Sequence, residues 1–299
     1  MTDRAAITAS YQRIQKWVRK TPIVEMEPGA FGVDHPMTLK LEQLQRSGSF
    51  KIRGAFNNLL ASDLPEPGVV AISGGNHGAA VALAATQLGA ASRVYVPAQI
   101  AIEVKLERMR RFGAEVVVAQ GSVDQAMAEY EAYAKTKGAL AVHPYGSPET
   151  ITGQGTVGLE FEDQAPDLDT VLVAVGGGGL IGGVASWYAG RVKIVAVETT
   201  GTNTLDRTLQ GTLCPDFRVS GISASGLGAA SIGALPMDII RAHVAENVVV
   251  LQVNGLQCHR RDRGGDRHKG QKDQVRAAAS GFVAGVRRLR KGRQGKTGR

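Results

Sequence analysis

Short apolar runs alternate with longer amphipathic or small-residue stretches along the first 250 residues of the chain. Runs typical of buried strands occur near Val69 and at 93–96, 115–119, 170–174 and 193–197, with a stretch of helical character between one run and the next. Regular alternation of this kind indicates right-handed βαβ units with parallel strands. The pattern therefore predicts an α/β fold.

The same reading predicts several further elements near the start and the middle of the chain. A first helix is expected to run to Val18, with Thr2 as its cap and Asp3 in its opening turn. Strands are expected at 38–42 and 140–143, and a helix at 52–60. The longest apolar runs are too short to span a membrane, so no membrane partner is expected.

A first glycine-rich turn, Ser73-Gly74-Gly75-Asn76-His77-Gly78, follows the predicted strand near Val69 and precedes a small-residue helix. Such a turn exposes backbone N–H groups at a helix N-terminus, where the helix dipole favours carboxylate or phosphate. Glycine-rich turns also occur after strands without any ligand. Taken alone, such a motif is more often a packing or turn device than a binding site.

A second glycine-rich turn, Val175-Gly176-Gly177-Gly178-Gly179-Leu180, follows the predicted strand at 170–174. Glycine is costly in ordered backbone, so four in succession favour close approach to a phosphate over a plain loop. The Gly-Lys-Ser/Thr ending of a nucleotide-binding loop is absent, as is an acidic residue placed to hold a ribose. Nucleotide binding, and with it a nicotinamide oxidoreductase, is therefore disfavoured.

One lysine lies just after a small, hydroxyl-rich turn, in the sequence Ser47-Gly48-Ser49-Phe50-Lys51. A lysine held against partly apolar surroundings can lose its proton and attack an aldehyde carbon. Most lysines near helix starts are solvated surface residues, so this motif gains weight only from the two glycine-rich turns that follow it.

The order of these motifs resembles the threonine/serine dehydratase family, pyridoxal-phosphate enzymes of the tryptophan synthase β fold group. The resemblance also includes Gly153-Gln154-Gly155-Thr156 and runs from about Thr21 to about Leu251. It implies an α/β protein of two three-layer domains with mostly parallel sheets. The smaller domain, at 47–145, would be inserted into a larger cofactor-binding domain made of 1–46 and 146–251. It also implies a homodimer.

The resemblance implies a pyridoxal 5'-phosphate site. Lys51 would carry the cofactor as a Schiff base and move the Cα proton as the catalytic residue. Phe50 would pack beside the cofactor, and Asn76 would hydrogen-bond its phenolic oxygen. The cofactor phosphate would lie against four glycines: Gly176, Gly177, Gly178 and Gly179.

The resemblance also implies how a small amino-acid substrate is held. Its carboxylate would meet a loop formed by Ser73, Gly75, Asn76 and His77, and Gln154 would border the pocket. His77 is given no acid–base role, since a structural histidine is the simpler interpretation.

The implied reaction is β-elimination from L-threonine, L-serine or a related 3-hydroxy amino acid, giving a 2-oxo acid and ammonia. In racemases of this family a serine two positions before the loop asparagine protonates the opposite face. Here that position is Gly74, which has no proton to give. Elimination is favoured, and an amino-acid racemase remains an alternative.

The divalent-cation site of some family members is incomplete in this chain. Glu198 matches its first ligand, but Thr204 stands where a second acidic ligand is expected. Two carboxylates are the usual minimum for a hard cation, so no essential metal is expected.

The composition changes abruptly at Gln252. Residues 252–299 hold 14 Lys and Arg against 3 Asp, a net charge of +11, whereas the remainder, with 21 basic and 24 acidic residues, has a net charge of −3. The expected Ser/Cys-Gly-Gly-Asn-like segment, whose side chain bonds the pyridine nitrogen, is not found there. An expected Glu-Pro-x-Gly-Ala-like segment is absent as well.

Three interpretations of this basic tail stay open. It is a scrambled end, as a change of reading frame would give; or a basic arm that binds a polyanion; or a solvated extension, with one amphipathic helix at 277–289. Phe282 is its single aromatic residue, so nucleic acid is an unlikely partner. The first interpretation allows a catalytically impaired relative, and the second allows a binding protein.

Length and composition agree with the dehydratase interpretation. The 299 residues suffice for one large or two medium domains, and 43% hydrophobic residues suffice for a substantial core. Two cysteines make a disulfide framework unlikely, which fits a reducing compartment. The N-terminus lacks the apolar region of a signal peptide. We therefore expect a cytoplasmic protein.

Overall fold

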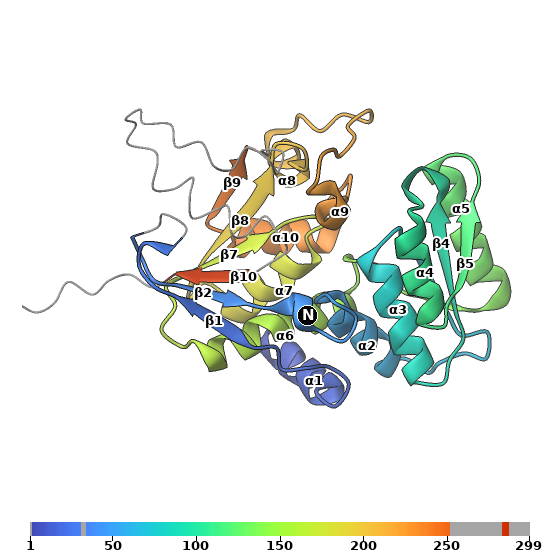
Figure 1. Cartoon of the computed structure of the whole chain (residues 1–299), viewed down its shortest axis with the longest axis horizontal. Coiled ribbons are helices and arrows are strands. Elements are labelled where there is room, and N and C mark those ends of the chain that lie inside the picture. The colour runs from blue at the N-terminus through green and yellow to red at the C-terminus, as the bar shows by residue number, and fades with distance from the viewer. Residues whose placement is uncertain (1, 31–33, 252–282, 287–299) are drawn as a thin grey trace, which may run out of the picture.

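Two separate sheets organise the chain (Figure 1), whose computed structural model describes residues 2–30, 34–251 and 283–286. The larger sheet has the strand order β1-β2-β10-β7-β8-β9, and the smaller has the order β5-β4-β3-β6. The strands are β1 (Ile23–Met26), β2 (Met37–Lys40), β3 (Val69–Ile72), β4 (Ser92–Pro97), β5 (Glu115–Ala119), β6 (Leu140–Ala141), β7 (Thr170–Ala174), β8 (Lys193–Thr199), β9 (Glu246–Val250) and β10 (Val283–Val286).

The smaller sheet is entirely parallel, as the βαβ pattern predicts. On one face, Val94 and Val96 pack against α3 (Asn76–Gln87) and α4 (Glu103–Arg111). On the other face, Val70 and Tyr95 pack against α5 (Val123–Lys137). Helix, sheet and helix therefore form three layers, and this alternation of inward residues comes directly from the period of a strand.

The larger sheet is mixed. Strands β7, β8 and β9 are parallel, whereas β1 and β10 run antiparallel to their neighbours. One face carries the main core, where Val171, Val173 and Ile194 pack against helices. The helices of that core are α1 (Arg4–Ile14), α6 (Pro148–Gln164), α7 (Gly179–Tyr188) and α10 (Ala234–His243).

One further helix and several short elements complete the parts of the fold built on the two sheets. Helix α2 (Lys51–Leu60) lies between them and joins the core of the smaller sheet through Ile52 and Phe56. The others are the 3-10 turns η2 (Glu42–Leu44) and η3 (Ala98–Ile100), and the helices α8 (Thr204–Gln210) and α9 (Ala224–Leu227). All four strands of the smaller sheet lie within 47–145, and the exact domain boundaries stay a prediction.

Predicted element boundaries differ from the structure by a few residues. The first helix ends at Ile14, and its cap is Asp3, whose carboxylate accepts a hydrogen bond from the Ala6 amide at 2.9 Å. A carboxylate satisfies a free helical amide and complements the dipole, so it takes the place expected for Thr2. The strand predicted at 38–42 is β2 and ends at Lys40, while that at 140–143 is β6 and ends at Ala141.

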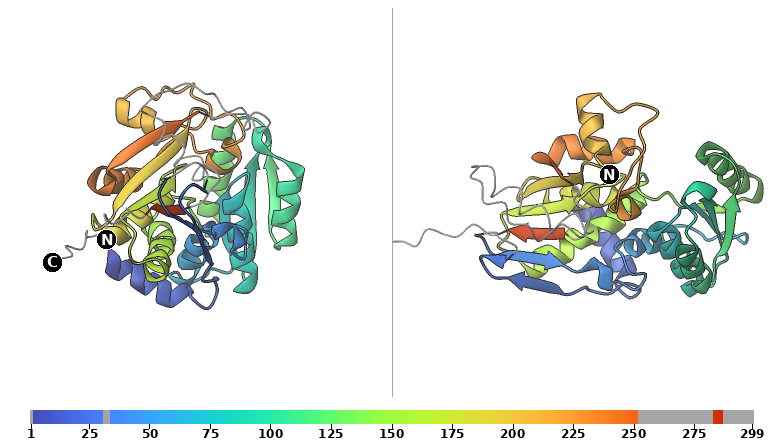
Figure 2. Two further views of the ribbon diagram at one scale, coloured as in Figure 1. Left: turned by 60° about the vertical axis from the view of Figure 1, so that its left-hand side comes forward. Right: turned by 45° about the horizontal axis from the view of Figure 1, so that its top comes forward.

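The third interpretation of the tail, a solvated extension with a helix at 277–289, is wrong at residues 283–286. These residues form β10, a strand between β2 and β7, in place of part of an amphipathic helix (Figure 1, Figure 2). All four are buried, so they are not a solvated extension. The gap between two strands of the larger sheet offers backbone partners on both sides, and this tertiary setting overrides the helical spacing of valines. The rest of 252–299 lies outside the described residues.

Replacing Val283 by aspartate should destabilise the protein by about 3 kcal/mol or more, because a carboxylate would be buried inside the sheet where the cross-strand cation, Lys40, is already paired with Glu160. Val283 is fully buried, and its neighbours across β10 are Lys40 and Val173. The measurement is the free energy of unfolding in urea. The matched control is Val104→Asp, at a valine that is 75% exposed, for which a change within about 0.5 kcal/mol is expected. Equal effects of the two substitutions would contradict the position of β10.

No helix in the described part of the chain is both long and apolar enough to cross a membrane.

Candidate active site

The segment from Val142 to Tyr145 brings the three sequence motifs together. The Lys51 ammonium donates a hydrogen bond to the Pro144 carbonyl at 2.8 Å. His77, in the first glycine-rich turn, donates from Nε2 to the Val142 carbonyl at 2.9 Å. The Tyr145 ring lies so close to the second glycine-rich turn that a Cβ atom at Gly177 would be 2.3 Å from it. Four consecutive residues thus contact all three motifs.

Lys51 is the first residue of α2 and carries an unusually acidic ammonium group. Burial lowers its pKa to about 8, since removal from water disfavours the charged form. A lysine with an ordinary pKa near 10.5 is almost wholly protonated at neutral pH. Lys51 supplies a much larger share of neutral amine there, and a neutral amine can attack a carbonyl or accept a proton.

Phe50 precedes Lys51, and its ring centroid lies 5.3 Å from the lysine nitrogen. The ring is partly buried and packs against the core of the larger body. It therefore forms an apolar wall beside the amine, and its place beside the cofactor stays a prediction.

The first glycine-rich turn ends at the start of α3, with Gly75 as the N-cap and Asn76 as the first helical residue. Ser73 bonds within the turn, because its hydroxyl accepts from the Gly75 amide at 3.1 Å. The first amides of a helix have no partner within the helix, so this end of α3 is suited to an anion.

The His77 side chain is buried and hydrogen-bonded within the protein. Burial, and secondly the charge of Lys51, lower its pKa to about 3. The ring is therefore neutral at physiological pH, and its hydrogen bond to Val142 anchors the turn. This geometry supports a structural role for the imidazole.

The second glycine-rich turn leads into α7, with Gly178 as the N-cap. Gly178 has a φ of +92°, a conformation that residues with a side chain rarely adopt. Gly177 needs the absence of a side chain because the Tyr145 ring lies against it. Gly176, in turn, lies beside Leu227 of α9. The turn thus presents the amides at the start of a buried helix, which is a suitable place for a phosphate.

Gln154 lies on α6 and packs against α2 at Gly54, a residue three positions after Lys51. Its side chain is 1% exposed and lies so close to Gly54 that a Cβ atom there would meet Nε2 at 2.5 Å. Its Oε1 atom is buried with no hydrogen-bond partner among the described residues, and the same is true of Ser49 Oγ. Of these two unsatisfied polar atoms, Ser49 Oγ belongs to a residue two positions before Lys51, and Gln154 Oε1 belongs to a side chain that contacts the helix begun by Lys51.

Sequence reasoning missed the role of 142–145. Its contacts are made largely by backbone carbonyls, which leave no mark on the sequence. The available signal was position: β6 pairs with β3, so the segment after β6 must emerge beside the turn that follows β3.

A second group that sequence reasoning missed is a buried cluster of four charged side chains, here called the buried charge cluster: Lys40, Glu42, Arg53 and Glu160. Arg53 donates to both carboxylates at 2.7 to 2.8 Å, and Lys40 donates to Glu160 at 2.7 Å. All four side chains are at most 1% exposed. The cluster fastens α2, and with it Lys51, to β2 and α6.

Glu198 and Thr204 are occupied by hydrogen bonds within the protein. The Glu198 carboxylate accepts from the amides of Leu205 and Asp206 at 2.7 and 2.8 Å. Burial raises its pKa to about 7, although these bonds oppose the shift. The Thr204 hydroxyl donates to the Ala229 carbonyl at 2.8 Å. Within the described ranges no group of three or more His, Cys, Asp or Glu side chains could hold a metal, and metal independence stays a prediction.

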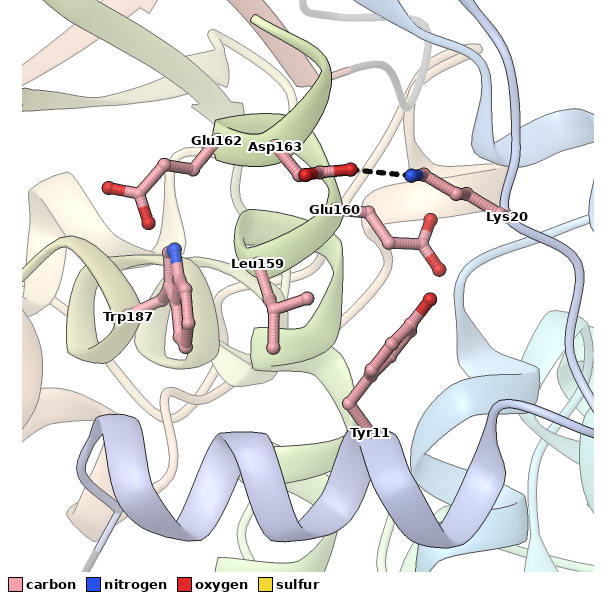
Figure 3. A pocket seen from close by; sticks show the side chains of 7 residues that line it. All are labelled: Tyr11, Lys20, Leu159, Glu160, Glu162, Asp163 and Trp187. Atoms are coloured by element: carbon pink, nitrogen blue, oxygen red, sulfur yellow. Dashed lines mark hydrogen bonds and ion pairs between the residues drawn. The ribbon is translucent and has the colours of Figure 1, made fainter. Parts of the chain in front are cut away.

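A pocket of about 390 Å³ lies away from these motifs (Figure 3). Lys20 and Asp163 form an ion pair at its rim, at 2.5 Å. Its lining residues are Tyr11, Lys20, Leu159, Glu160, Glu162, Asp163 and Trp187. None of the predicted site residues is among them, so this pocket lies apart from the candidate site.

Comparison with known proteins establishes the family. A family model described as "Pyridoxal-phosphate dependent enzyme" matches residues 14–261. The chain belongs to this family, which confirms the resemblance to the threonine/serine dehydratases and the tryptophan synthase β-like α/β fold.

Relatives of two activities are similar to this chain. L-threonine ammonia-lyase of Geobacter sulfurreducens is 36% identical over 255 residues, which are 84% of this chain and 63% of that enzyme. Serine racemase of Oryza sativa subsp. indica is 33% identical over 259 residues, 85% of this chain and 76% of the racemase. The solved structure of maize serine racemase gives a TM-score of 0.78 at 34% identity, covering 83% of this chain and 77% of that one. The chain thus spans less than two thirds of the Geobacter enzyme.

The residues of the site fit pyridoxal phosphate, the cofactor of this family. The Lys51 amine, with its lowered pKa, suits a Schiff base with an aldehyde. The start of α7 suits a phosphate, and the unsatisfied Ser49 and Gln154 oxygens suit a polar ligand close by. The candidate site thus combines an amine for the aldehyde, helix amides for the phosphate, and free polar atoms for the remaining polar groups of the cofactor.

Proposed function

We propose that this protein removes water from L-threonine, L-serine or a related 3-hydroxy amino acid in a pyridoxal-phosphate-dependent β-elimination, releasing a 2-oxo acid and ammonia. The observation that carries the proposal is the meeting of Lys51 and both glycine-rich turns at 142–145. The likeness to L-threonine ammonia-lyase supports the same reaction class.

Each motif has a distinct task in this proposal. Bound pyridoxal phosphate supplies the electron sink for the charge left at Cα. The amides at the start of α7, from Gly176 to Gly179, hold its phosphate, and Phe50 and Asn76 line its ring. The start of α3, at Ser73 and Gly75 to His77, receives the substrate carboxylate, and Gln154 borders the pocket.

Lys51 moves the proton. As a neutral amine it accepts the Cα proton, which its lowered pKa allows near neutral pH. The Pro144 carbonyl accepts a hydrogen bond from Lys51 and so holds the nitrogen in one place. The partly apolar wall at Phe50 limits water and keeps the amine desolvated.

Two other functions remain as alternatives. The similarity to rice serine racemase favours racemisation, whereas Gly74 in place of a serine argues against it. A catalytically impaired relative that binds a polyanion through its basic tail is the second alternative. We also propose, from the resemblance alone, a cytoplasmic homodimer.

Turnover by the full chain tests the proposal. The protein is mixed with pyridoxal phosphate and then with L-threonine or L-serine, while 2-oxo acid, ammonia and D-amino acid are measured together. Equal amounts of 2-oxo acid and ammonia are expected, with D-amino acid at background. D-amino acid without 2-oxo acid would instead support the racemase. Bound cofactor without either product would support the impaired relative.

A further inference from the structure

Gly74 lies beneath the side chain of Ile100. A Cβ atom at position 74 would lie 2.7 Å from Ile100 Cδ1 and 2.9 Å from its Cγ1. Such separations are well below the usual contact distance of about 3.5–4.0 Å between carbon atoms. By contrast, a Cβ atom at Gly75 would meet nothing within 4 Å. Of these two neighbouring glycines, only the first is covered by another side chain.

The topology of the smaller sheet explains why Ile100 lies there. Strands β3 and β4 are parallel neighbours, and the Ser73 amide still donates to the Tyr95 carbonyl at 2.9 Å. The segments that leave their carboxyl ends are therefore adjacent. After β4 the chain makes the single turn η3, which ends at Ile100. The Gln99 side chain donates to the Gly121 carbonyl and anchors that turn.

Ile100 is not a core residue. Its side chain is 49% exposed, although an isoleucine gains most free energy when it is fully buried. It stands at the edge of the turn that is proposed to receive the substrate carboxylate. A large apolar side chain at that edge excludes both water and polar groups from the space above Gly74.

We propose that Ile100 is a specificity-determining residue, because it occupies the space in which a serine at position 74 would hold its hydroxyl group. The proposal rests on the proposed function, in which Lys51 removes the Cα proton. Inversion at Cα requires one proton to leave to Lys51 and another to arrive from a donor on the opposite face. Gly74 offers no donor, and Ile100 fills the place where one would stand. Loss of the β-hydroxyl group is then the favoured outcome.

A set of four proteins tests this assignment: the wild type, Gly74→Ser, Ile100→Ala and the double variant. Each full chain is loaded with pyridoxal phosphate and given L-serine, and the ratio of D-serine to pyruvate is measured. The double variant should raise this ratio at least about ten-fold over both the wild type and Gly74→Ser, since only it has a donor and the room for it. An equal ratio in Gly74→Ser and the double variant would overturn the role of Ile100. A double variant that forms pyruvate without a raised ratio would overturn it too.

Thermal unfolding tests the same contact without any need for activity. Gly74→Ser should lower Tm by about 3–8 °C, as overpacking does. When residue 100 is already alanine, Gly74→Ser should lower Tm by less than half as much as it does in the wild type. The remaining close neighbour, the Ile100 carbonyl oxygen, would lie 3.1 Å from the new Cβ atom and needs to move only slightly. Gly75→Ser is the matched control, whose Tm shift Ile100→Ala should leave unchanged. Strictly additive shifts for Gly74→Ser and Ile100→Ala would overturn the proposal. Absence of 2-oxo acid in every protein, with the expected Tm coupling intact, would count against the proposed function alone.

Discussion

Replacing Lys51 by alanine is expected to lower 2-oxo-acid formation by about 1,000-fold or more, because one nitrogen atom both binds the cofactor covalently and moves the Cα proton. The substitution removes the amine whose pKa burial lowers to about 8 and which donates a hydrogen bond to the Pro144 carbonyl. The visible absorption band of the bound cofactor should disappear with it. Both readouts are taken on the full chain mixed with pyridoxal phosphate.

The matched control is Lys137→Ala, at an exposed lysine in the last turn of α5. It should leave both the absorption band and the rate near their wild-type values. Far-ultraviolet circular dichroism of the Lys51 variant checks that the fold persists. A Lys51→Ala protein that retains more than about a tenth of the wild-type rate would sink the catalytic assignment.

The sequence predicts those parts of the site that are formed by a few consecutive residues. A lysine after a small turn, and glycines at the start of a helix, carry their chemistry within six or so residues, so the motifs could be read without the fold. Their meeting at 142–145 could not, because the contacts there are backbone carbonyls reached from β6. The covering of Gly74 by Ile100 is equally invisible, since it depends on the pairing of β3 with β4.

The fold shows the same division. Alternating strands and helices are periodic features and were predicted correctly, whereas β10 was not. Four residues, Val283 to Val286, are too few for a strand period to be distinguished from helical spacing. They also lie in a segment whose basic composition is typical of a solvated tail. What makes them a strand is the pair of backbone edges that β2 and β7 present, which is a tertiary property.

The buried charge cluster was missed for a related reason. Lys40 and Glu42 fell within the strand predicted at 38–42 and Arg53 within the helix predicted at 52–60, and none of these predictions brought them together. Charged residues are almost never fully buried unless they are paired, so sequence alone assigns them to the surface. Only the fold brings two cations and two carboxylates to one place, where their charges balance. Figure 3 shows one member of this cluster, Glu160, in the lining of the pocket near Tyr11.

Replacing Arg53 by methionine should destabilise the protein by about 3–5 kcal/mol, because two buried carboxylates would then share the single charge of Lys40. Methionine retains much of the volume, so the loss is electrostatic rather than a cavity. The measurement is the free energy of unfolding in urea. The matched control is Arg110→Met on α4, which breaks an exposed ion pair with Glu103 and should cost less than about 1 kcal/mol.

The double variant Arg53→Met/Glu42→Gln separates charge balance from the other roles of arginine. It leaves Lys40 and Glu160 as a neutral pair, so it should be more stable than Arg53→Met alone, even though it carries one more substitution. An Arg53→Met protein as stable as Arg110→Met, or a double variant less stable than Arg53→Met, would contradict this electrostatic account.

The buried charge cluster also makes the stability of the wild-type protein depend on pH in the acid range. Burial alone would raise the pKa of Glu42, but the charge and hydrogen bonds of Arg53 outweigh it and hold the pKa below the ordinary value of 4.5. A carboxyl whose pKa is lower in the folded state stabilises the fold at pH above about 4.5, and this contribution is lost as the pH falls through the lowered value. The difference in stability between the wild type and Arg53→Met should therefore shrink below that pH.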